Sequence, residues 1–428
     1  MRRRLLLGLI SLLCAVALAE GATRLWLRID GRGYERAAAE RAIGETLAAV
    51  GYLTAGAVAE RDETGERRGP EYELQPYSGY VHKTVALRTA EITALFRSGT
   101  EGAYVVVAQG GSVAAGFQGR GLPMLVQSLE DSGATADREV RVFGLSVPGY
   151  KQPQQLTQLA YLLSQGCRPD LVLNLDGLNE LRISSGNLDS GLEPGFPSRG
   201  QWGSLLTGQR ADGTELDGLL RVHQAQQEAL ELGNRFLERG DCASALTGTL
   251  ALSRMARSQE RWTLAQTTLI DSRTERLKSR GAVGYKAKPE GRDAVLEAVA
   301  CWKRSSLAMH QLCEARGIRY VHVLQPTLHD EGSKVMTEEE RRGGVNDEGL
   351  HPAVVRGYPL LREALSELRE AGVEALDACD TFKEVPQTIY VDSCHVTQEG
   401  NRILADNIAR MMELPERPDR NSDPTKNK

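Results

Sequence analysis

Three short segments, far apart in the sequence, contain the residue types that nucleophilic acyl chemistry requires. Ser112 follows two glycines and is a candidate nucleophile. Asn179 carries a side-chain amide that can donate a hydrogen bond to an oxyanion. Asp392 and His395 are three residues apart, so in a turn the carboxylate can reach the Nδ1–H of the imidazole and orient it as a general base. Together the three segments predict a site that cleaves or transfers an acyl group.

Each segment has a simpler interpretation when it is taken alone. A Gly-Gly-Ser sequence after a strand is more often a plain tight turn, and Asn and Gly are good turn formers. A phosphate-binding loop is disfavoured, because Gly110-x-Ser112-x-x-Ala115 lacks two of the three glycines of the dinucleotide pattern and no Lys follows it. An isolated Asp-x-x-His is more often a surface turn, and a metal pair would need further ligands nearby.

The elements that must position these residues are five apolar runs, which we interpret as buried parallel strands. They are rich in Val, Leu or aromatic residues, and each is followed within three residues by Gly, Pro or Asp. The runs are Tyr104–Ala108, Val140–Leu145, Asp170–Leu175, Tyr320–Leu324 and Val373–Leu376. Because the carboxyl ends of parallel strands meet at one edge of a sheet, the candidate residues are expected to converge there.

Amphipathic helical patterns alternate with the runs, which predicts an α/β sheet with helices on both faces. The helical patterns cover Gln154–Gln165, Asp293–Arg316, Tyr358–Ala371 and Glu399–Met412. Gly149 follows the second run, where a bare backbone N–H can serve as a further oxyanion donor.

With these residues in this order, the chain resembles the SGNH hydrolases, also called GDSL-type esterases. The four conserved blocks of that family are matched by Ser112, Gly149, Asn179 and His395, with Asp392 as the third triad member. The matching motifs are Asp-Gly-Leu-Asn-Glu at 176–180 and Asp-x-x-His at 392–395, and the resemblance covers roughly 103–182 and 308–412.

The resemblance implies a three-layer α/β/α sandwich around a five-stranded parallel sheet, of the flavodoxin-like SGNH type. It implies a Ser112–His395–Asp392 triad, with an oxyanion hole formed by Ser112, Gly149 and Asn179 and with no metal or organic cofactor. One departure is plain, because Gly111 stands where the family usually has the Asp of Gly-Asp-Ser. That Asp is not a triad member, but its loss weakens any inference about the substrate.

The resemblance leaves three functions open. The first is a serine esterase that cleaves a short acyl group from a small-molecule or carbohydrate ester. The second is an O-acyltransferase in which a hydroxyl of a cell-surface polysaccharide, instead of water, resolves the acyl-enzyme. The third is a non-catalytic glycan-binding protein on the same fold. Gln325 and His329 follow the fourth strand and are candidate substrate contacts, although structural roles are favoured for both.

The N-terminus has the pattern of an export signal. Three arginines at positions 2–4 precede the uncharged apolar run Leu5–Ala19, and Ala17-Leu18-Ala19 offers a small-x-small cleavage site. A cleaved signal peptide and a retained membrane anchor are both compatible with this pattern. In either case the bulk of the chain is expected to be exported, periplasmic or extracellular, with membrane contact only through the N-terminal segment.

Composition gives a broad class and excludes others. Hydrophobic residues make up 41% and charged residues 25% of the 428 residues, a globular balance. The net charge of −5 argues against a nucleic-acid partner. The cysteines contain no CxxC pair, so a structural zinc site is not expected. Cys379 and Cys394 flank a short segment and are candidates for a disulfide in an oxidising compartment.

Domain boundaries follow from these patterns. We expect a signal or anchor over 1–19, an N-terminal extension over 20–102, the hydrolase domain over 103–413 and a disordered tail over 414–428. Within the domain, 183–291 is expected to be an insertion, with a Gly-, Ser- and Pro-rich loop over 184–213 and two or three polar helices over 215–280.

Overall fold

The five apolar runs form one parallel sheet, as the sequence predicted. The computed structural model describes residues 2–29, 33–52, 72–99, 102–207, 213–279, 288–341 and 351–414. The strands of the sheet are β3 (Ala103–Gly110), β4 (Glu139–Gly144), β5 (Leu171–Asp176), β6 (Arg319–Leu324) and β7 (Glu374–Asp377). Every residue of β5 is buried, as expected for a central strand with both faces covered.

The strand order in the sheet is β4-β3-β5-β6-β7, all parallel. This is the flavodoxin-like order, in which the first strand of the sheet lies between the second and the third. The loop after β3 is therefore flanked by the loops after β4 and β5. These are the three loops that carry Ser112, Gly149 and Asn179.

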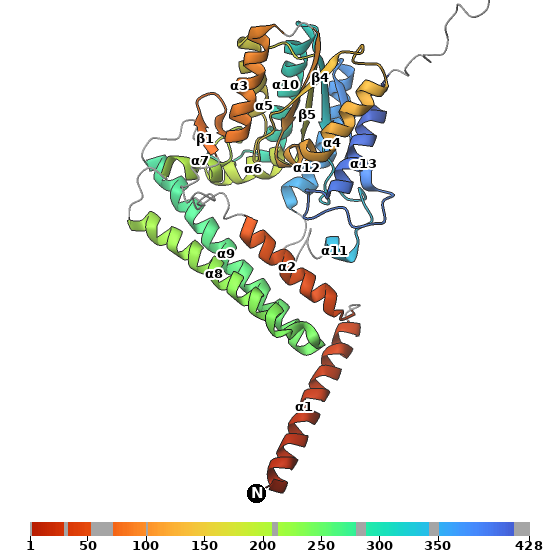
Figure 1. Ribbon diagram of the computed structural model, residues 1–428. Helices are drawn as coiled ribbons and strands as arrows, with labels where there is room; N and C mark the ends of the chain where they lie inside the picture. Colours follow the sequence, from red (N-terminus) through yellow and green to blue (C-terminus); the bar gives the residue numbers. More distant parts are fainter. Residues whose placement is uncertain are drawn as a thin grey trace, which may run out of the picture. The chain divides into compact units, whose positions relative to one another are not determined.

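Helices cover both faces of the sheet, which gives the predicted three layers (Figure 1). One face is covered by α4 (Ser112–Asp131) and α13 (Gln398–Met411), which pack closely against each other. The other is covered by α5 (Gln154–Ser164), α10 (Ala294–Glu314) and α12 (Pro352–Glu370). Val321 and Val323 of β6 are fully buried in the apolar core between the layers.

The chain divides into two compact units, and both are discontinuous in sequence. The sheet unit comprises Tyr72–Leu206 and Leu277–Lys428, and the helical unit comprises Met1–Glu71 and Thr207–Arg276. The helical unit contains α1 (Arg2–Ile29), α2 (Arg36–Tyr52), α8 (Gly213–Arg239) and most of α9 (Ala245–Ser279). Its interior includes Ile43 and Met255, which are buried together with Phe236.

These boundaries differ from the expected ones at two places. Residues 72–99, predicted as part of an extension, belong to the sheet unit, where they form the hairpin β1 (Tyr72–Gln75) and β2 (Gly79–His82) and the helix α3 (Lys83–Ser98). The helices α8 and α9 of the predicted insertion pack with α2 as a separate compact unit, because their apolar residues are buried against the apolar residues of α2.

The segment predicted as a loop, 184–213, is partly helical. It contains the end of α6 (Leu178–Asp189) and all of α7 (Arg199–Thr207). The remaining short elements are α11 (Glu338–Glu340) and 3-10 turns at Asp241–Ala243 and Cys379–Phe382. The expected tail, 414–428, lies outside the described residues except for Leu414.

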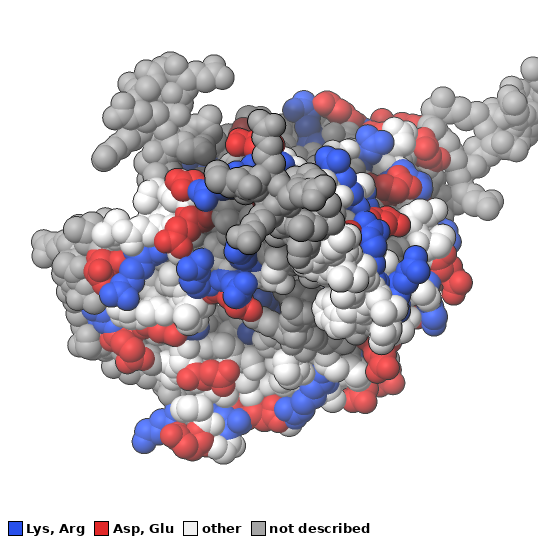
Figure 2. Space-filling view, turned by 90° about the horizontal axis from the view of Figure 1, so that it is seen from below, with Lys and Arg blue, Asp and Glu red and all other residues white. Residues whose placement is uncertain are grey.

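The predicted N-terminal apolar segment lies within α1. No helix in the described ranges combines the length and the apolar character that crossing a membrane requires. On the face shown in Figure 2, acidic and basic side chains alternate over short distances, so neither sign forms a continuous patch there.

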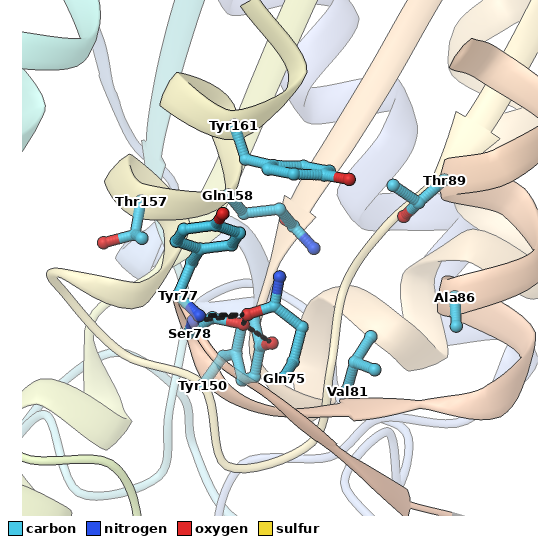
Figure 3. Close-up of a pocket in the computed structure, with 10 residues that line it drawn as sticks. All are labelled: Gln75, Tyr77, Ser78, Val81, Ala86, Thr89, Tyr150, Thr157, Gln158 and Tyr161. Atoms are coloured by element: carbon cyan, nitrogen blue, oxygen red, sulfur yellow. Dashed lines mark hydrogen bonds between the residues drawn. The ribbon is translucent and has the colours of Figure 1, made fainter. Parts of the chain in front are cut away.

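A cavity of about 180 Å³ lies between the β1–β2 hairpin, α3 and α5 (Figure 3). Hydroxyl and amide groups line it, including those of Ser78, Tyr161 and Gln158, and no charged side chain does. None of the predicted catalytic residues lines this cavity. The site that they form must therefore be built from the loops at the carboxyl edge of the sheet.

Candidate functional site

The first loop places Ser112 at the start of a helix. β3 ends at Gly110, whose φ of +146° favours glycine and whose Cβ, if present, would overlap the backbone oxygen of Leu175 on the neighbouring strand. Gly111 is the N-cap of α4, and Ser112 is the first helical residue. The Ser112 side chain is partly exposed and its backbone N–H lies in the first turn, where N–H groups have no helical partner.

The second loop lies directly beside the first. Val147 N donates to Gly110 O (3.0 Å), so the chain leaving β4 continues alongside the end of β3. A turn closed by the bond from Tyr150 N to Val147 O (3.0 Å) then presents Gly149 with a φ of +79°. A side chain at Gly149 would come within 2.8 Å of the Tyr80 hydroxyl, so this turn requires glycine for its conformation and for its space.

The third loop brings Asn179 against the other two. Gly177 ends β5 with a φ of +138°, and Asn179 follows in the first turn of α6. The Asn179 Nδ2 donates to Tyr150 O (3.0 Å) and occupies the space that a Cβ on Gly111 would fill. A side-chain amide has two N–H donors, so one remains for a ligand next to Ser112.

Glu180 ties the second and third loops together, a role that sequence reasoning missed. Its Oε2 accepts from Gly177 N (2.9 Å), and its Oε1 accepts from Gln152 N (3.1 Å). Burial, with a further contribution from the charge of Asp176, raises the pKa of Glu180 to about 8. The side chain is therefore a neutral, buried carboxyl at pH 7 that holds the loops carrying Gly149 and Asn179 in register. The Asp-Gly-Leu-Asn-Glu motif contained this signal, because its Glu is at the N3 position of a helix.

Beneath these loops lies a buried polar network centred on Asp176. Its carboxylate accepts from Trp302 Nε1 (2.6 Å), His322 Nε2 (2.8 Å) and Asn174 Nδ2 (2.6 Å). Ser306 Oγ lies 2.6 Å from Nδ1 of His322, so Ser306, His322 and Asp176 are joined by hydrogen bonds in that order. Ser306 and His322 are 0% exposed, so a substrate cannot reach them. The network therefore acts as a scaffold under the motif that carries Asn179.

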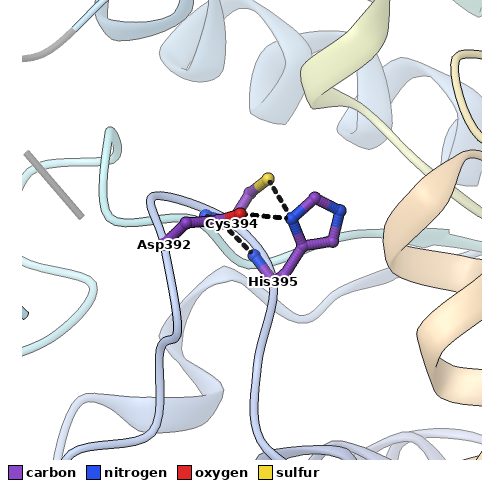
Figure 4. Close-up of side chains that lie close together, drawn as sticks. All are labelled: Asp392, Cys394 and His395. Atoms are coloured by element: carbon purple, nitrogen blue, oxygen red, sulfur yellow. Dashed lines mark hydrogen bonds and ion pairs between the residues drawn. The ribbon is translucent and has the colours of Figure 1, made fainter. Parts of the chain in front are cut away.

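The fourth loop carries an oriented acid–base pair (Figure 4). Asp392 Oδ2 lies 2.6 Å from Nδ1 of His395, and Asp392 Oδ1 accepts from the backbone N–H groups of Cys394 (2.8 Å) and His395 (2.7 Å). Thr327 Oγ1 donates to Ser393 O (2.8 Å), which fixes the loop to the segment after β6. The carboxylate thus bonds both the backbone of the turn and the imidazole.

The charges of this pair reinforce each other. Burial opposes ionisation of His395, but the hydrogen bond with Asp392 and the contact with the Cys394 thiol outweigh it and raise the pKa of His395 above its ordinary value. In the same way, burial raises the pKa of Asp392, but the bonds from His395 outweigh burial and lower it to about 2. Asp392 is therefore ionised throughout the physiological range and stabilises an imidazolium.

Ser112 and His395 lie at or just before the starts of two helices that pack against each other. Ser112 opens α4 and His395 lies three residues before α13, and the two helices cross at Gly121, where a Cβ would come within 2.8 Å of Asn401 O. Within the described residues, the side-chain bonds of His395 go to Asp392 and Cys394 and none goes to Ser112. Nε2 of His395 therefore remains available, and catalytic hydrogen bonds often form only with substrate bound.

The two candidate substrate contacts are both buried. Gln325 is 3% exposed and its backbone pairs with Asp176 O and the Tyr358 hydroxyl. His329 is 4% exposed and its Nδ1 accepts from His351 N (3.0 Å). Burial, aided by the charge of Arg182, lowers the pKa of His329 to about 4, so it is neutral. These positions fit the structural roles that the sequence favoured.

Cys379 and Cys394 are both free thiols in the structure. Cys379 is buried with its Sγ 3.8 Å from Gln325 O, whereas Cys394 Sγ lies 3.6 Å from Nδ1 of His395. Sequence reasoning considered these cysteines only as a pair and missed the contact between Cys394 and the predicted base. The adjacency of Cys394 and His395 in the sequence was the signal available.

No protein-family model matches the chain, and no curated protein matches it. Solved structures with a similar arrangement include an acetyl xylan esterase, at 10% identity and a TM-score of 0.33, covering 71% of this chain and 97% of that chain. A GDSL-like lipase from Bacteroides thetaiotaomicron VPI-5482 has 11% identity and a TM-score of 0.35, covering 77% and 97%. A putative acylhydrolase from Bacteroides fragilis NCTC 9343 has 10% identity and a TM-score of 0.32, covering 72% and 86%.

Proposed function

We propose that this chain is a serine esterase of the SGNH type. The observation that carries the proposal is the bonding of three strand-end loops into one assembly, in which the Asn179 amide lies against Gly111 and donates to Tyr150 O. Strand order alone would bring plain turns at these positions near one another, but it would not require a side-chain amide to lie against Gly111. The oriented pair Asp392 and His395 supplies the base that such an assembly needs.

The proposed reaction follows from the position of each group. Ser112 Oγ attacks the ester carbonyl while Nε2 of His395 takes its proton, and Asp392 stabilises the imidazolium that forms. The N–H groups of Ser112 and Gly149 and the second N–H of the Asn179 amide hold the oxyanion. The imidazolium then protonates the leaving alcohol, and a water molecule, deprotonated by His395, releases the acyl group from Ser112.

The test is a comparison of Ser112→Ala with Ser128→Ala on short-chain aryl esters. Ser128 lies on the same helix and donates to Met124 O, so it is a matched control far from the proposed oxyanion hole. We expect Ser112→Ala to abolish hydrolysis with an unchanged melting temperature, and Ser128→Ala to retain it. Equal activity in Ser112→Ala and the unchanged protein would refute the proposal.

A serine-directed phosphonate tests the same site without a substrate. We expect it to label Ser112 and not the buried Ser306, because only the first is accessible. A folded protein that is not labelled would favour the non-catalytic alternative. If labelling occurs, product analysis with and without a glycan acceptor distinguishes water from a sugar hydroxyl as the group that resolves the acyl-enzyme.

Export by residues 1–19 is part of the same proposal, supported by the arginines at 2–4 and the uncharged run after them. The measurement is a fusion of residues 1–30 to a reporter that is active only outside the cytoplasm. An inactive reporter would contradict export, and N-terminal sequencing of an active fusion would distinguish cleavage after Ala19 from retention.

A further inference from the structure

The loop of the proposed catalytic pair contains a third group with metal-binding chemistry. Asp392 Oδ2, Cys394 Sγ and His395 Nδ1 all lie within 4.8 Å of one another (Figure 4). A metal site at Asp392 and His395 needs further ligands nearby. In the structure, the thiol of Cys394 is such a ligand. Carboxylate, thiolate and imidazole are the three ligand types that zinc prefers.

The three potential ligand atoms lie close enough together to bind one ion. Nδ1 of His395 lies 2.6 Å from Asp392 Oδ2 and 3.6 Å from Cys394 Sγ, so the ring nitrogen faces the carboxylate and the thiol at the same time. In a tetrahedral zinc site with bonds of roughly 2.0 to 2.3 Å, neighbouring ligand atoms lie about 3.3 to 3.7 Å apart. The nitrogen–sulfur separation already fits this range, and the nitrogen–oxygen separation needs a movement of less than about 1 Å to reach it.

The cluster is open to ions from solvent. The side chain of Asp392 is 47% exposed and that of His395 is 37% exposed, whereas Cys394 is buried beneath them at 6%. An ion can therefore approach from the side of the carboxylate and the imidazole and meet the sulfur behind them. A fourth position would remain for water, as in zinc sites with three protein ligands.

We propose that Asp392, Cys394 and His395 bind one zinc ion, which takes the place of the proton on Nδ1. On binding, bonds form from zinc to the carboxylate oxygen, to sulfur and to Nδ1. The thiol and Nδ1 of the imidazolium each lose a proton to solvent, and the imidazole keeps its other proton on Nε2. No oxidation or reduction is involved.

This exchange has a functional consequence that rests on the proposed esterase function. With zinc on Nδ1, Nε2 holds a proton and has no lone pair to accept one from Ser112. The bound ion also separates His395 from the carboxylate that orients it. Zinc at this site is therefore a reversible inhibitor of the esterase, and its removal by a chelator restores the base.

Metal binding is tested on the full chain with Co²⁺, whose bond to a thiolate gives a charge-transfer band in the near ultraviolet. We expect one equivalent of Co²⁺ to give this band, and Zn²⁺ to displace it, in the unchanged protein and in Cys14→Ser. Cys14 is a matched control because its thiol is exposed and lies outside the cluster. Cys394→Ser is expected to lose the band and to bind Zn²⁺ at least tenfold more weakly.

Asp392→Asn provides a second variant in case Cys394→Ser does not fold, as judged by circular dichroism. It keeps the thiol but replaces the charged ligand, so we expect the band with at least tenfold weaker Zn²⁺ binding. A band that persists unchanged in a folded Cys394→Ser protein, or no band in the unchanged protein, overturns the proposed site.

Esterase assays with Zn²⁺ and then a chelator separate the two proposals. Inhibition with the same dissociation constant as Zn²⁺ binding, reversed by the chelator, supports both. A cobalt band in a protein without esterase activity supports the metal site and counts against the proposed function. Full esterase activity with the site saturated by Zn²⁺ overturns the inhibition.

Discussion

At the scale of single residues, Gly111 is required because the side chain of Asn179 fills the space beside it. The space beside its Cα is occupied by the Asn179 amide nitrogen, with Tyr150 O 3.2 Å from where a Cβ would lie. A side chain at position 111 and the observed position of the Asn179 amide therefore exclude each other. Glycine here is required for the position of a neighbour and not for its own backbone conformation.

Gly111→Ala tests this directly. The methyl group has to displace the end of the Asn179 side chain, which is cheap in stability because that end can rotate. Loss of one oxyanion donor lowers kcat by about 10²–10³-fold, so we expect a large fall in kcat with a change of less than about 1 kcal/mol in the free energy of unfolding.

The control for Gly111→Ala is Gly116→Ala in the same helix, where nothing lies within 4 Å of the added methyl group. We expect this variant to keep its activity and to gain roughly 0.5–1 kcal/mol in stability from the higher helix propensity of Ala. Equal activities for the two variants would mean that Asn179 does not act from its observed position.

The pH dependence of activity is a second prediction at this scale. The base must be neutral, and Asp392 and Cys394 raise the pKa of His395, so kcat/KM should increase with pH and reach half its maximum above pH 6.5. Asp392→Asn removes the stronger of the two interactions and should move this midpoint to lower pH while reducing kcat. A midpoint that stays in place in Asp392→Asn would contradict the assigned pair.

At the scale of elements, the sequence predicted those features that depend on local pattern. The five strands and the helices α5, α10, α12 and α13 all coincide with predicted runs to within a few residues, apart from the start of α12, because an apolar period is visible in the sequence. The clamp by Glu180 was not predicted, since it depends on the distance between two loops that are 25 residues apart. The helical unit was not predicted for a related reason, because α2 and α8 pack together although they are far apart in the sequence.

Glu180 gives a prediction that belongs to these loops. Its pKa is about 8 in the folded protein and 4.5 in an ordinary environment. Between these values the folded state holds a proton that the unfolded state has lost, so the free energy of unfolding decreases by about 1.4 kcal/mol per pH unit as pH rises. Gln cannot titrate, and Glu180→Gln should therefore show a flatter dependence between pH 5 and pH 8.

The measurement for Glu180→Gln is urea unfolding at several pH values. Glu363→Gln, at an exposed position on α12, serves as the control and should keep the slope of the unchanged protein. Equal slopes for all three proteins would show that Glu180 is not a buried neutral group. A reduced kcat in Glu180→Gln would further indicate that the clamp positions Asn179.

At the scale of the whole molecule, the division into two units predicts two unfolding transitions. Glu20 lies in α1 and caps the start of α9, accepting from Ala245 N (2.9 Å) and Leu246 N (2.8 Å). These bonds, Leu246 first, lower the pKa of Glu20 to about 2 although burial opposes them. Loss of a helix cap costs about 1 kcal/mol.

Glu20→Ala should therefore lower the melting temperature of one transition, that of the helical unit, and leave the other in place. Glu40→Ala is a suitable control because its ion pair with Arg36 is exposed and caps no other helix. The measurement is calorimetry of the unchanged protein, Glu20→Ala and Glu40→Ala, which gives the melting temperature of each transition. A shift of both transitions by Glu20→Ala would contradict the independence of the units.

The discontinuous units also set an order of events during synthesis of the chain on the ribosome. The helical unit is complete at Arg276, whereas β6 begins at Arg319 and β7 ends at Asp377, about a hundred residues later. At roughly 5–20 residues per second this interval lasts on the order of 5–20 s. In the first half of this interval, until β6 ends at Leu324, β5 is an unpaired edge of a three-stranded sheet, and such edges recruit other strands. The nascent chain thus depends on protection of that edge until its fourth strand has been translated.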